Sequence, residues 1–357
     1  MYPSFIFLIV TTIAGSAAAQ NSVGTTPFSY DDAGLIREAK SVVTKPGPVV
    51  AAHPRGIPSP LYGITVETTD GRYSTSTVQP MSIFEAAMAR VRAQEFFPLA
   101  QQEPRNFSAE LTESLAKLPH KPTTRVVFQP IWPVSEYVQT LPRIHGVSYV
   151  MGEILDSFFV SKYSVGEYLA RTSEYLGALG DNVDIWEIGN EINGEWLGKT
   201  PEVAAKMAGA YDIVKAAGKT TALTLYYNQG CSDDEHEVFS WAQANVPERM
   251  KQGLDYVFLS YYEADCEGLR PDWSAVFHKL ATMFPNSKLG IGECGTKPNA
   301  DLPQKADYIY RYYRMNPGVS NFVGGYFWWY YSQDMVPYTQ PLWGILSNAM
   351  SGPSSKR

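Results

Sequence analysis

Eight short apolar runs alternate with helix-like stretches along most of this chain. Most runs are apolar throughout, which is typical of parallel strands covered by helices. Eight such strands with helices between them close into a (β/α)₈ TIM barrel, so we predict an α/β fold of this type in a single domain. The runs are LYGITVE (61–67), RVVFQP (125–130), GVSYVMGE (146–153), VDIWEIGNE (183–191), ALTLYYN (222–228), LDYVFLSYYE (254–263), KLGIGE (288–293) and VGGYFWWYY (323–331).

Helix start and stop signals lie between most of these runs. Ser164 and Glu167 form a capping box, and Gly180 follows the last turn of that predicted helix. Thr200 and Pro201 are typical of the first residues of another helix. These signals separate the runs as a barrel requires.

Two connections depart from this pattern. Helical signals in 82–95 and again in 108–117 indicate an insertion between the first two strands. The connection PVSEYVQTLPRI (133–144) contains an internal proline, which disfavours a regular helix.

A doubly wound open sheet is the alternative architecture. Such sheets bind ligands in one crevice and often carry a glycine-rich phosphate loop after a strand. No such loop follows any of the runs, and polar residues gather at many strand ends. The closed barrel therefore fits the sequence better.

The ends of the predicted strands are rich in carboxylates and aromatic side chains. In a (β/α)₈ barrel, residues at the C-terminal ends of the strands face the active site. No histidine stands at any of these ends. The residues there are Glu67, Gln129, Glu153, Asn190, Glu191, Tyr226, Tyr227, Asn228, Tyr261, Tyr262, Glu263, Glu293 and Trp328 to Tyr331.

The segment DIWEIGNEINGEW (184–196) places several polar side chains on and after an apolar run. Strand side chains alternate, so Glu187 and Glu191 share one face, while Trp186 and Ile188 share the other. Glu191 is predicted at the rim, where it can reach a ligand. Glu187 lies deeper and needs a partner, because an isolated buried charge is strongly disfavoured. Arg125 in the second run is the candidate partner.

A second carboxylate, Glu293, ends the apolar run in GIGECGT (290–296). Gly292 and Gly295 flank it and allow close approach of backbone and ligand. Two glutamates across a cleft are what glycoside hydrolysis requires: one protonates the leaving oxygen, and the other attacks or stabilises the anomeric carbon. Glu191 and Glu293 are therefore the candidate catalytic pair.

WEIGNE (186–191), GIGECG (290–295) and the tryptophan-rich GGYFWWYY (324–331) resemble the retaining glycoside hydrolases of clan A, which are (β/α)₈ barrels. The resemblance implies that Glu191 is the acid/base and Glu293 the nucleophile. It also implies a contact from Asn190 to the sugar 2-hydroxyl. It further implies a hydrogen bond to the nucleophile from Tyr261 or Tyr262, and an aromatic floor from Trp328 or Trp329. Arg125 resembles the arginine of the second strand in that clan, although here it begins the run.

The resulting hypothesis is a retaining glycosidase, and the main alternative is a barrel that binds carbohydrate without cleaving it. Glu191, Glu293 and Asn190 occur together, which favours the enzyme. The chain also holds 23 Tyr and 8 Trp, side chains that stack on sugars. A net charge of -7 without any basic run argues against nucleic acid and acidic membrane surfaces as partners.

A metal-dependent barrel enzyme is the third hypothesis. The segment CSDDEHE (231–237) combines carboxylates with a histidine. We interpret it as a charged, solvated loop, because it matches no metal-binding motif. The chain lacks an H-E-x-x-H motif. The sequence thus predicts neither a metal nor a cofactor.

The N-terminus resembles an export signal. Residues 5–19 form an apolar run too short to span a bilayer, and alanines 17–19 precede Gln20 as in an A-x-A cleavage site. We therefore predict a signal peptide (1–19), a Pro/Gly-rich lead-in (20–60), a catalytic barrel (61–350) and a short tail (351–357). The protein is predicted to be secreted.

The chain contains three cysteines, and a disulfide between two of them is compatible with an exported protein. Cys231 and Cys266 are predicted in the neighbouring loops after strands five and six, where an oxidising compartment permits a disulfide. Cys294 alternates to the opposite strand face from Glu293 and is predicted to be a buried free thiol.

Overall fold

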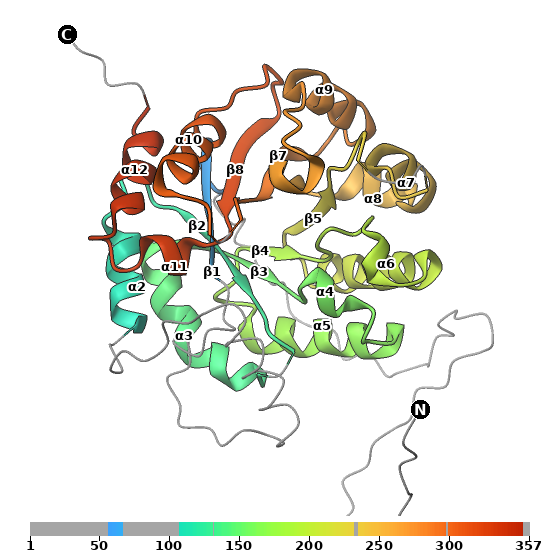
Figure 1. The fold of residues 1–357 in the computed structure, drawn as a ribbon. Helices are drawn as coiled ribbons and strands as arrows, with labels where there is room; N and C mark the ends of the chain where they lie inside the picture. The colour runs from blue at the N-terminus through green and yellow to red at the C-terminus, as the bar shows by residue number, and fades with distance from the viewer. Residues whose placement is uncertain (1–55, 67–106, 131, 232–234, 298, 353–357) are drawn as a thin grey trace, which may run out of the picture. The chain divides into compact units, whose positions relative to one another are not determined.

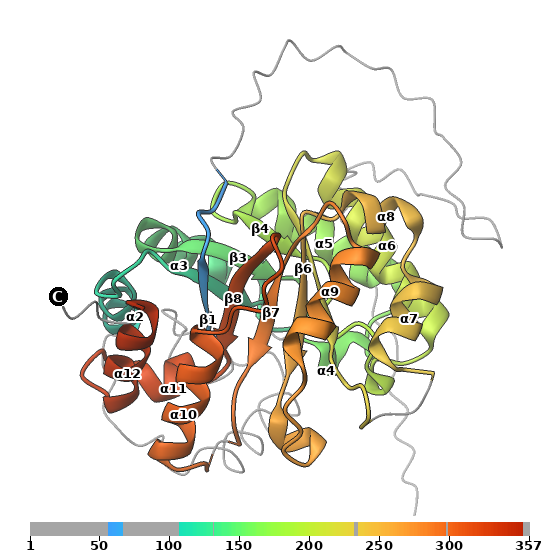
Figure 2. The same ribbon diagram turned by 90° about the horizontal axis from the view of Figure 1, so that it is seen from above.

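The computed structural model describes residues 56–66, 107–130, 132–231, 235–297 and 299–352. Eight parallel strands follow one another in sequence order and close into a barrel, with β8 paired to β1. Helices surround the strands, and β8 lies between β1 and β7 where the barrel closes (Figures 1 and 2). The predicted (β/α)₈ barrel is confirmed.

Every predicted run overlaps one strand, and most strands are shorter than their runs. The largest difference is at β4, where only three residues pair although 183–191 was predicted. After Glu187 the regular strand ends, although backbone hydrogen bonds of Ile188 and Ile192 still join the chain to β5, and Glu191 adopts a left-handed φ of 49°. The strands are β1 (Leu61–Val66), β2 (Thr123–Val127), β3 (Tyr149–Glu153), β4 (Ile185–Glu187), β5 (Thr221–Tyr226), β6 (Tyr256–Tyr261), β7 (Lys288–Cys294) and β8 (Phe322–Trp328).

The helices also follow their sequence signals. Both halves of the capping box between Ser164 and Glu167 are present at the start of α5. Two short 3₁₀ segments, η1 (Glu195–Leu197) and η2 (Glu263–Cys266), follow β4 and β6. The α-helices are α2 (Phe107–Ala116), α3 (Val134–Val147), α4 (Ser157–Val160), α5 (Val165–Leu179), α6 (Thr200–Ala216), α7 (Val238–Asn245), α8 (Glu248–Gly253), α9 (Trp273–Met283), α10 (Leu302–Tyr313), α11 (Tyr331–Met335) and α12 (Pro341–Met350).

Helix α3 forms despite the proline that was expected to disfavour it. Pro142 lies inside the helix, while Tyr137, Leu141 and Ile144 are buried against the rest of the barrel. Burial of such side chains contributes more than the backbone cost of one proline. The predicted helical stretch 82–95 and the strand-end residue Glu67 lie outside the described residues.

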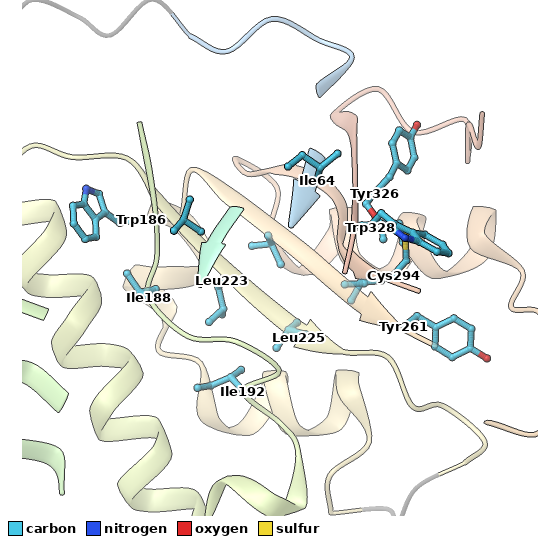
Figure 3. Close-up of a cluster of buried hydrophobic side chains, with 14 of the residues drawn as sticks. Ile64, Trp186, Ile188, Ile192, Leu223, Leu225, Tyr261, Cys294, Tyr326 and Trp328 are labelled. Atoms are coloured by element: carbon cyan, nitrogen blue, oxygen red, sulfur yellow. Dashed lines mark hydrogen bonds between the residues drawn. The ribbon is translucent and has the colours of Figure 1, made fainter. Parts of the chain in front are cut away.

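Two apolar clusters occupy the two sides of the sheet. The larger lies between strands and helices and includes Trp186, Ile188, Tyr261 and Trp328, which Figure 3 draws among its members. The smaller cluster fills the barrel interior, because its members from six strands contact one another. Its members are Leu61, Met151, Ile185, Ala222, Tyr256, Phe258, Val323 and Phe327.

The predicted disulfide is confirmed. Cys231, after β5, is bonded to Cys266 at the end of η2, with a Cα–Cα distance of 5.5 Å. A bridge that closes 35 residues stabilises the folded chain by about 3–4 kcal/mol in the chain-entropy model. Cys294 is buried and free, as predicted. None of the helices within the described part of the chain has the length and apolarity of a membrane span.

Candidate active site

A cavity of about 420 Å³ opens at the C-terminal ends of the strands. This volume lies within the range of small-molecule sites, about 300–1,000 Å³. Its walls combine carboxylates, hydroxyls and aromatic rings from the strand ends and from the loops that follow them. The lining residues are Asp156, Ser157, Asn190, Glu191, Trp196, Tyr226, Tyr262, Ala264, Asp265, Glu293, Thr296, Lys297, Trp329 and Tyr330.

Glu191 lies just beyond β4, with only 9% of its surface exposed. Its Oε2 accepts a hydrogen bond of 2.8 Å from Ser157 Oγ, and its Oε1 accepts one of 2.6 Å from Ser260 Oγ. The left-handed backbone at this residue is unusual outside glycine, and such conformations cluster at functional sites. The fold thus holds this carboxyl in one orientation at the cavity wall.

Glu293 lies in β7 and is bound by a different kind of partner. Its Oε2 accepts a 2.6 Å hydrogen bond from Arg125 Nη1, and its Oε1 accepts a 2.7 Å bond from the Tyr262 hydroxyl. Gly292 precedes it on the interior face of the sheet. A Cβ there would lie 2.5 Å from Phe258 Cβ, so packing within the barrel requires glycine at this position.

Arg125 is fully buried at the centre of a carboxylate cluster. The predicted pairing with Glu187 is present, since Arg125 Nε lies 2.6 Å from Glu187 Oε2. The same guanidinium contacts Glu293 through Nη1 and lies 3.0 Å from Glu153 Oε2 through Nη2. Thr224 adds a short hydrogen bond to Glu187 Oε1. The guanidinium of Arg125 therefore contacts three carboxyl groups at once, above the apolar side chains that fill the barrel interior.

The two candidate catalytic carboxyls have shifted pKa values. Burial, and secondly the charge of Glu293, raise the pKa of Glu191 to about 8. Burial also raises the pKa of Glu293 above its usual range, against the opposing effects of Arg125 and Tyr262. Glu191 is therefore suited to hold a proton at neutral pH, while Glu293 is surrounded by groups that favour its charged form.

Asn190 lines the cavity next to Glu191, as the sequence predicted, and is 2% exposed. Its buried Oδ1 has no hydrogen-bond partner among the described residues. Because an unpaired buried oxygen is costly, this atom is available to a ligand that carries a donor.

The two aromatic doublets each divide between cavity and core. Tyr262 reaches the cavity and Glu293, whereas Tyr261 is fully buried and donates its hydroxyl to Leu269 O at 2.6 Å. Trp329 lines the cavity, and its ring lies 5.7 Å from the Arg125 guanidinium. Trp328 is fully buried and donates from Nε1 to Asp334 Oδ2 at 3.0 Å.

Of the two predicted alternatives in each doublet, the structure thus places Tyr262 and Trp329 at the cavity, while Tyr261 and Trp328, which were also predicted as possible substrate contacts, are buried away from it. Both are the last residues of their strands and point outward into the cluster beneath the helices (Figure 3). The next residue of each doublet lies just past the strand end and faces the cavity.

This division predicts opposite effects for two tryptophan variants. Trp328→Ala should destabilise the fold by about 3–5 kcal/mol, because it empties a buried site. Trp329→Ala should leave the free energy of unfolding nearly unchanged, and under the sequence-based hypothesis of a glycosidase it should lower kcat/KM at least about tenfold through lost stacking. Urea denaturation and glycoside kinetics measure the two effects. Two variants that both fold and hydrolyse normally would remove β8 from the site.

Several cavity residues were missed by sequence reasoning. Ser157 and Asp156 follow β3, Trp196 belongs to η1, and Asp265 and Lys297 lie in the loops after β6 and β7. Short polar residues at strand ends occur in most barrels, so no sequence signal separates these from ordinary loop residues. Trp196 was marked only by its place in the segment 184–196.

The structure describes no arrangement suited to a metal. Within the described ranges, no group of three or more His, Cys, Asp or Glu side chains is placed to hold an ion. Part of the segment 231–237 lies outside those ranges.

Comparison with known proteins shows similarity of fold. No protein-family model matches this chain, and no curated protein matches it in sequence. A GH5_18 protein from Bifidobacterium longum subsp. longum matches with a TM-score of 0.52 and 10% identity, over 83% of this chain and 80% of that one. A GH5-4 broad-specificity endoglucanase from an uncultured bacterium matches with a TM-score of 0.50 and 11% identity, over 82% and 95%. At these identities the similarity shows a shared fold.

Proposed function

We propose that this protein is a secreted glycosidase that cleaves O-glycosidic bonds by a retaining double displacement. The observation that carries the proposal is the pair of buried carboxyls at one cavity with opposite surroundings. Among the described residues, Glu191 accepts hydrogen bonds from two hydroxyls, and burial raises its pKa to about 8. Glu293 accepts from a guanidinium and a phenol, which oppose the effect of burial on its pKa. Such a difference is what an acid and a nucleophile require.

In the first step, Glu293 attacks the anomeric carbon of the bound sugar. The bond from that carbon to Glu293 forms as its bond to the glycosidic oxygen breaks, and Glu191 gives its proton to the departing oxygen. Arg125 and Tyr262 hold the Glu293 carboxylate in place for the attack. The products are a free alcohol and a glycosyl ester of Glu293.

In the second step, water attacks the anomeric carbon and the ester bond to Glu293 breaks. Glu191, now ionised, accepts the proton that the water loses. Esterification of Glu293 removes the charge that helped to raise the pKa of Glu191, so the same carboxyl can act as the base. Two displacements at one carbon retain its configuration.

Other observations support this proposal over a barrel that only binds carbohydrate. Binding alone requires no pair of buried carboxyls of which one has a raised pKa and the other is bound by a cation. One of the solved structures of similar fold is named an endoglucanase. Secretion and the predicted signal peptide belong to the same proposal, and the disulfide is consistent with an oxidising compartment.

Replacing Glu191 by alanine tests the proposal. Hydrolysis of substrates with poor leaving groups should fall about 10²–10⁴-fold, while good leaving groups should still depart because they need no proton. Added azide should then attack the glycosyl ester and give a product of retained configuration, which NMR of the anomeric centre identifies. Glu195→Ala, an exposed glutamate of η1, is the matched control. A product of inverted anomeric configuration would exclude this role of Glu191. So would a loss of activity of the same size for substrates with good and with poor leaving groups.

The pKa of Glu191 also predicts the pH profile. Glu191 must be protonated in the free enzyme, so kcat/KM should fall as the pH rises above about 8. Below the pKa of Glu293, kcat/KM should fall again, because the nucleophile gains a proton. In Glu191→Ala assayed with a good leaving group, the alkaline fall should disappear. Its persistence in that variant would assign the alkaline limb to another group.

A further inference from the structure

Two serine hydroxyls bind Glu191 from opposite sides of its carboxyl group. Ser157 is the first residue of α4, and Ser260 lies in β6. Each bonds a different oxygen, Ser157 Oγ to Oε2 at 2.8 Å and Ser260 Oγ to Oε1 at 2.6 Å. Both serines are buried. These bonds fix the plane of the carboxyl group and leave only its remaining lone-pair positions for a proton.

A third side chain sets the direction of one of these bonds. Trp196 Nε1 lies 3.2 Å from Ser157 Oγ, and an indole N–H can only donate. Ser157 therefore accepts from Trp196, and its own hydrogen is directed to Glu191. Trp196 lines the cavity, where 37% of its surface is exposed, and its ring packs edge-on against Tyr226. The ring also covers Gly194, where a Cβ would lie 2.6 Å from it.

We propose that Ser157 and Ser260 are positioning residues for the acid/base: as fixed donors they orient the carboxyl of Glu191 and stabilise its ionised form, with Trp196 setting the direction of the Ser157 hydroxyl. This inference rests on the proposed function, because it assigns the two serines to the charge cycle of Glu191. Neither residue needs to touch the sugar for this role.

Burial and the neighbouring carboxylates act on Glu191 in the opposite sense to the two serine bonds. Burial, the charge of Glu293 on β7 and that of Asp156 before α4 all favour the protonated carboxyl, whereas the two serine bonds favour the charged one. The hydroxyls of Tyr226 on β5 and Tyr262 after β6 are neutral, since burial raises the pKa of each. Asp265 and Lys297 are the remaining charged residues of the cavity wall.

The two serine bonds are expected to matter most in the second displacement. After Glu191 has given up its proton, it must remain ionised long enough to accept one from water. Two donors lower the free energy of that ionised state in a buried site. Without them the carboxyl would favour its protonated form, so the glycosyl ester would be hydrolysed more slowly and the alkaline limb of kcat/KM would move to higher pH.

The test is a direct titration of Glu191. Carbon-13 NMR of carboxyl-labelled glutamate, with Glu191→Gln to assign the signal, gives the pKa without a substrate. In Ser157→Ala and in Ser260→Ala that pKa should rise by about one unit each, and by more in the double variant. Ser287→Ala is the matched control, because the hydroxyl of this buried serine donates to Leu254 O and the residue lies outside the cavity.

Two further variants separate positioning from simple packing. Ser157→Thr retains the hydroxyl and should restore the wild-type pKa. Trp196→Phe removes the indole donor and should raise the pKa of Glu191 less than Ser157→Ala does, because the hydroxyl remains but its hydrogen is no longer directed. If Ser260→Ala fails to fold, the Ser157 series alone decides the matter.

An unchanged pKa of Glu191 in folded Ser157→Ala and Ser260→Ala would overturn the inference, even in an active glycosidase. A protein that cleaves no glycan, while Glu191 still titrates as expected in the variants, would overturn the proposed function and leave the two serines as the groups that hold this carboxyl.

Discussion

Glu293→Gln is expected to reduce turnover of every glycoside substrate by at least about 10⁴-fold, while the protein remains folded. The amide has nearly the size of the carboxylate and still fills its site in β7, but it cannot form the glycosyl ester. Steady-state kinetics and circular dichroism measure the two parts of this result.

The loss of charge in Glu293→Gln has a second effect. Because the charge of Glu293 helps to raise the pKa of Glu191, that pKa should fall in the variant. Glu248→Gln, at an exposed residue of α8, is the control for an equivalent change outside the cavity. Full activity in Glu293→Gln would refute the nucleophile assignment.

Arg125→Met is expected to destabilise the fold by about 3–5 kcal/mol or more at pH 8. The variant keeps a long side chain but leaves Glu187, Glu293 and Glu153 buried without their cation. Urea denaturation measures the change. Arg249→Met is the matched control, since its partner Asp212 is exposed and the pair contributes less than about 1 kcal/mol.

The destabilisation should depend on pH with a definite sign. Without Arg125, the pKa values of Glu153 and Glu293, which burial already raises, should rise further above their unfolded values. Stability is then present at a pH below the unfolded pKa values and is lost as the pH rises through the folded ones. The difference from wild type should therefore be largest at pH 8 and smallest near pH 4. A difference that does not change with pH would mean that packing around Arg125, rather than charge, holds this part of the barrel.

The sequence was sufficient for the framework and for the central residues of the site. Apolar runs predicted all eight strands, because parallel strands covered by helices must be apolar. Alternation along the fourth run correctly placed Trp186 on the outer face, and the cost of an unpaired buried charge correctly paired Glu187 with Arg125. The two glutamates were found because each follows a run at the end where barrels bind ligands.

Alternation alone could not decide between adjacent residues at the strand ends. It holds only while the chain remains in the sheet, and Tyr262 and Trp329 each follow the last residue of their strand, whereas Glu191 lies four residues past the end of β4. Their directions depend on local backbone geometry, such as the left-handed φ at Glu191, which requires tertiary contacts. Ser157 and Ser260 could not be found at all, because their role depends on which carboxyl they meet.

The closed barrel also places the residues of the cavity on two kinds of segment that tolerate insertions and deletions differently. Arg125, Ser260 and Glu293 are carried by strands whose positions are fixed by neighbours on both sides. Thr296, Lys297 and Asp265 are carried by connecting segments that can lengthen or shorten without altering the strand pairing. If the protein is the glycosidase proposed above, mutations in those segments would change which sugar fits while Glu191 and Glu293 keep their geometry, so new specificities would arise in small, separately tolerated steps.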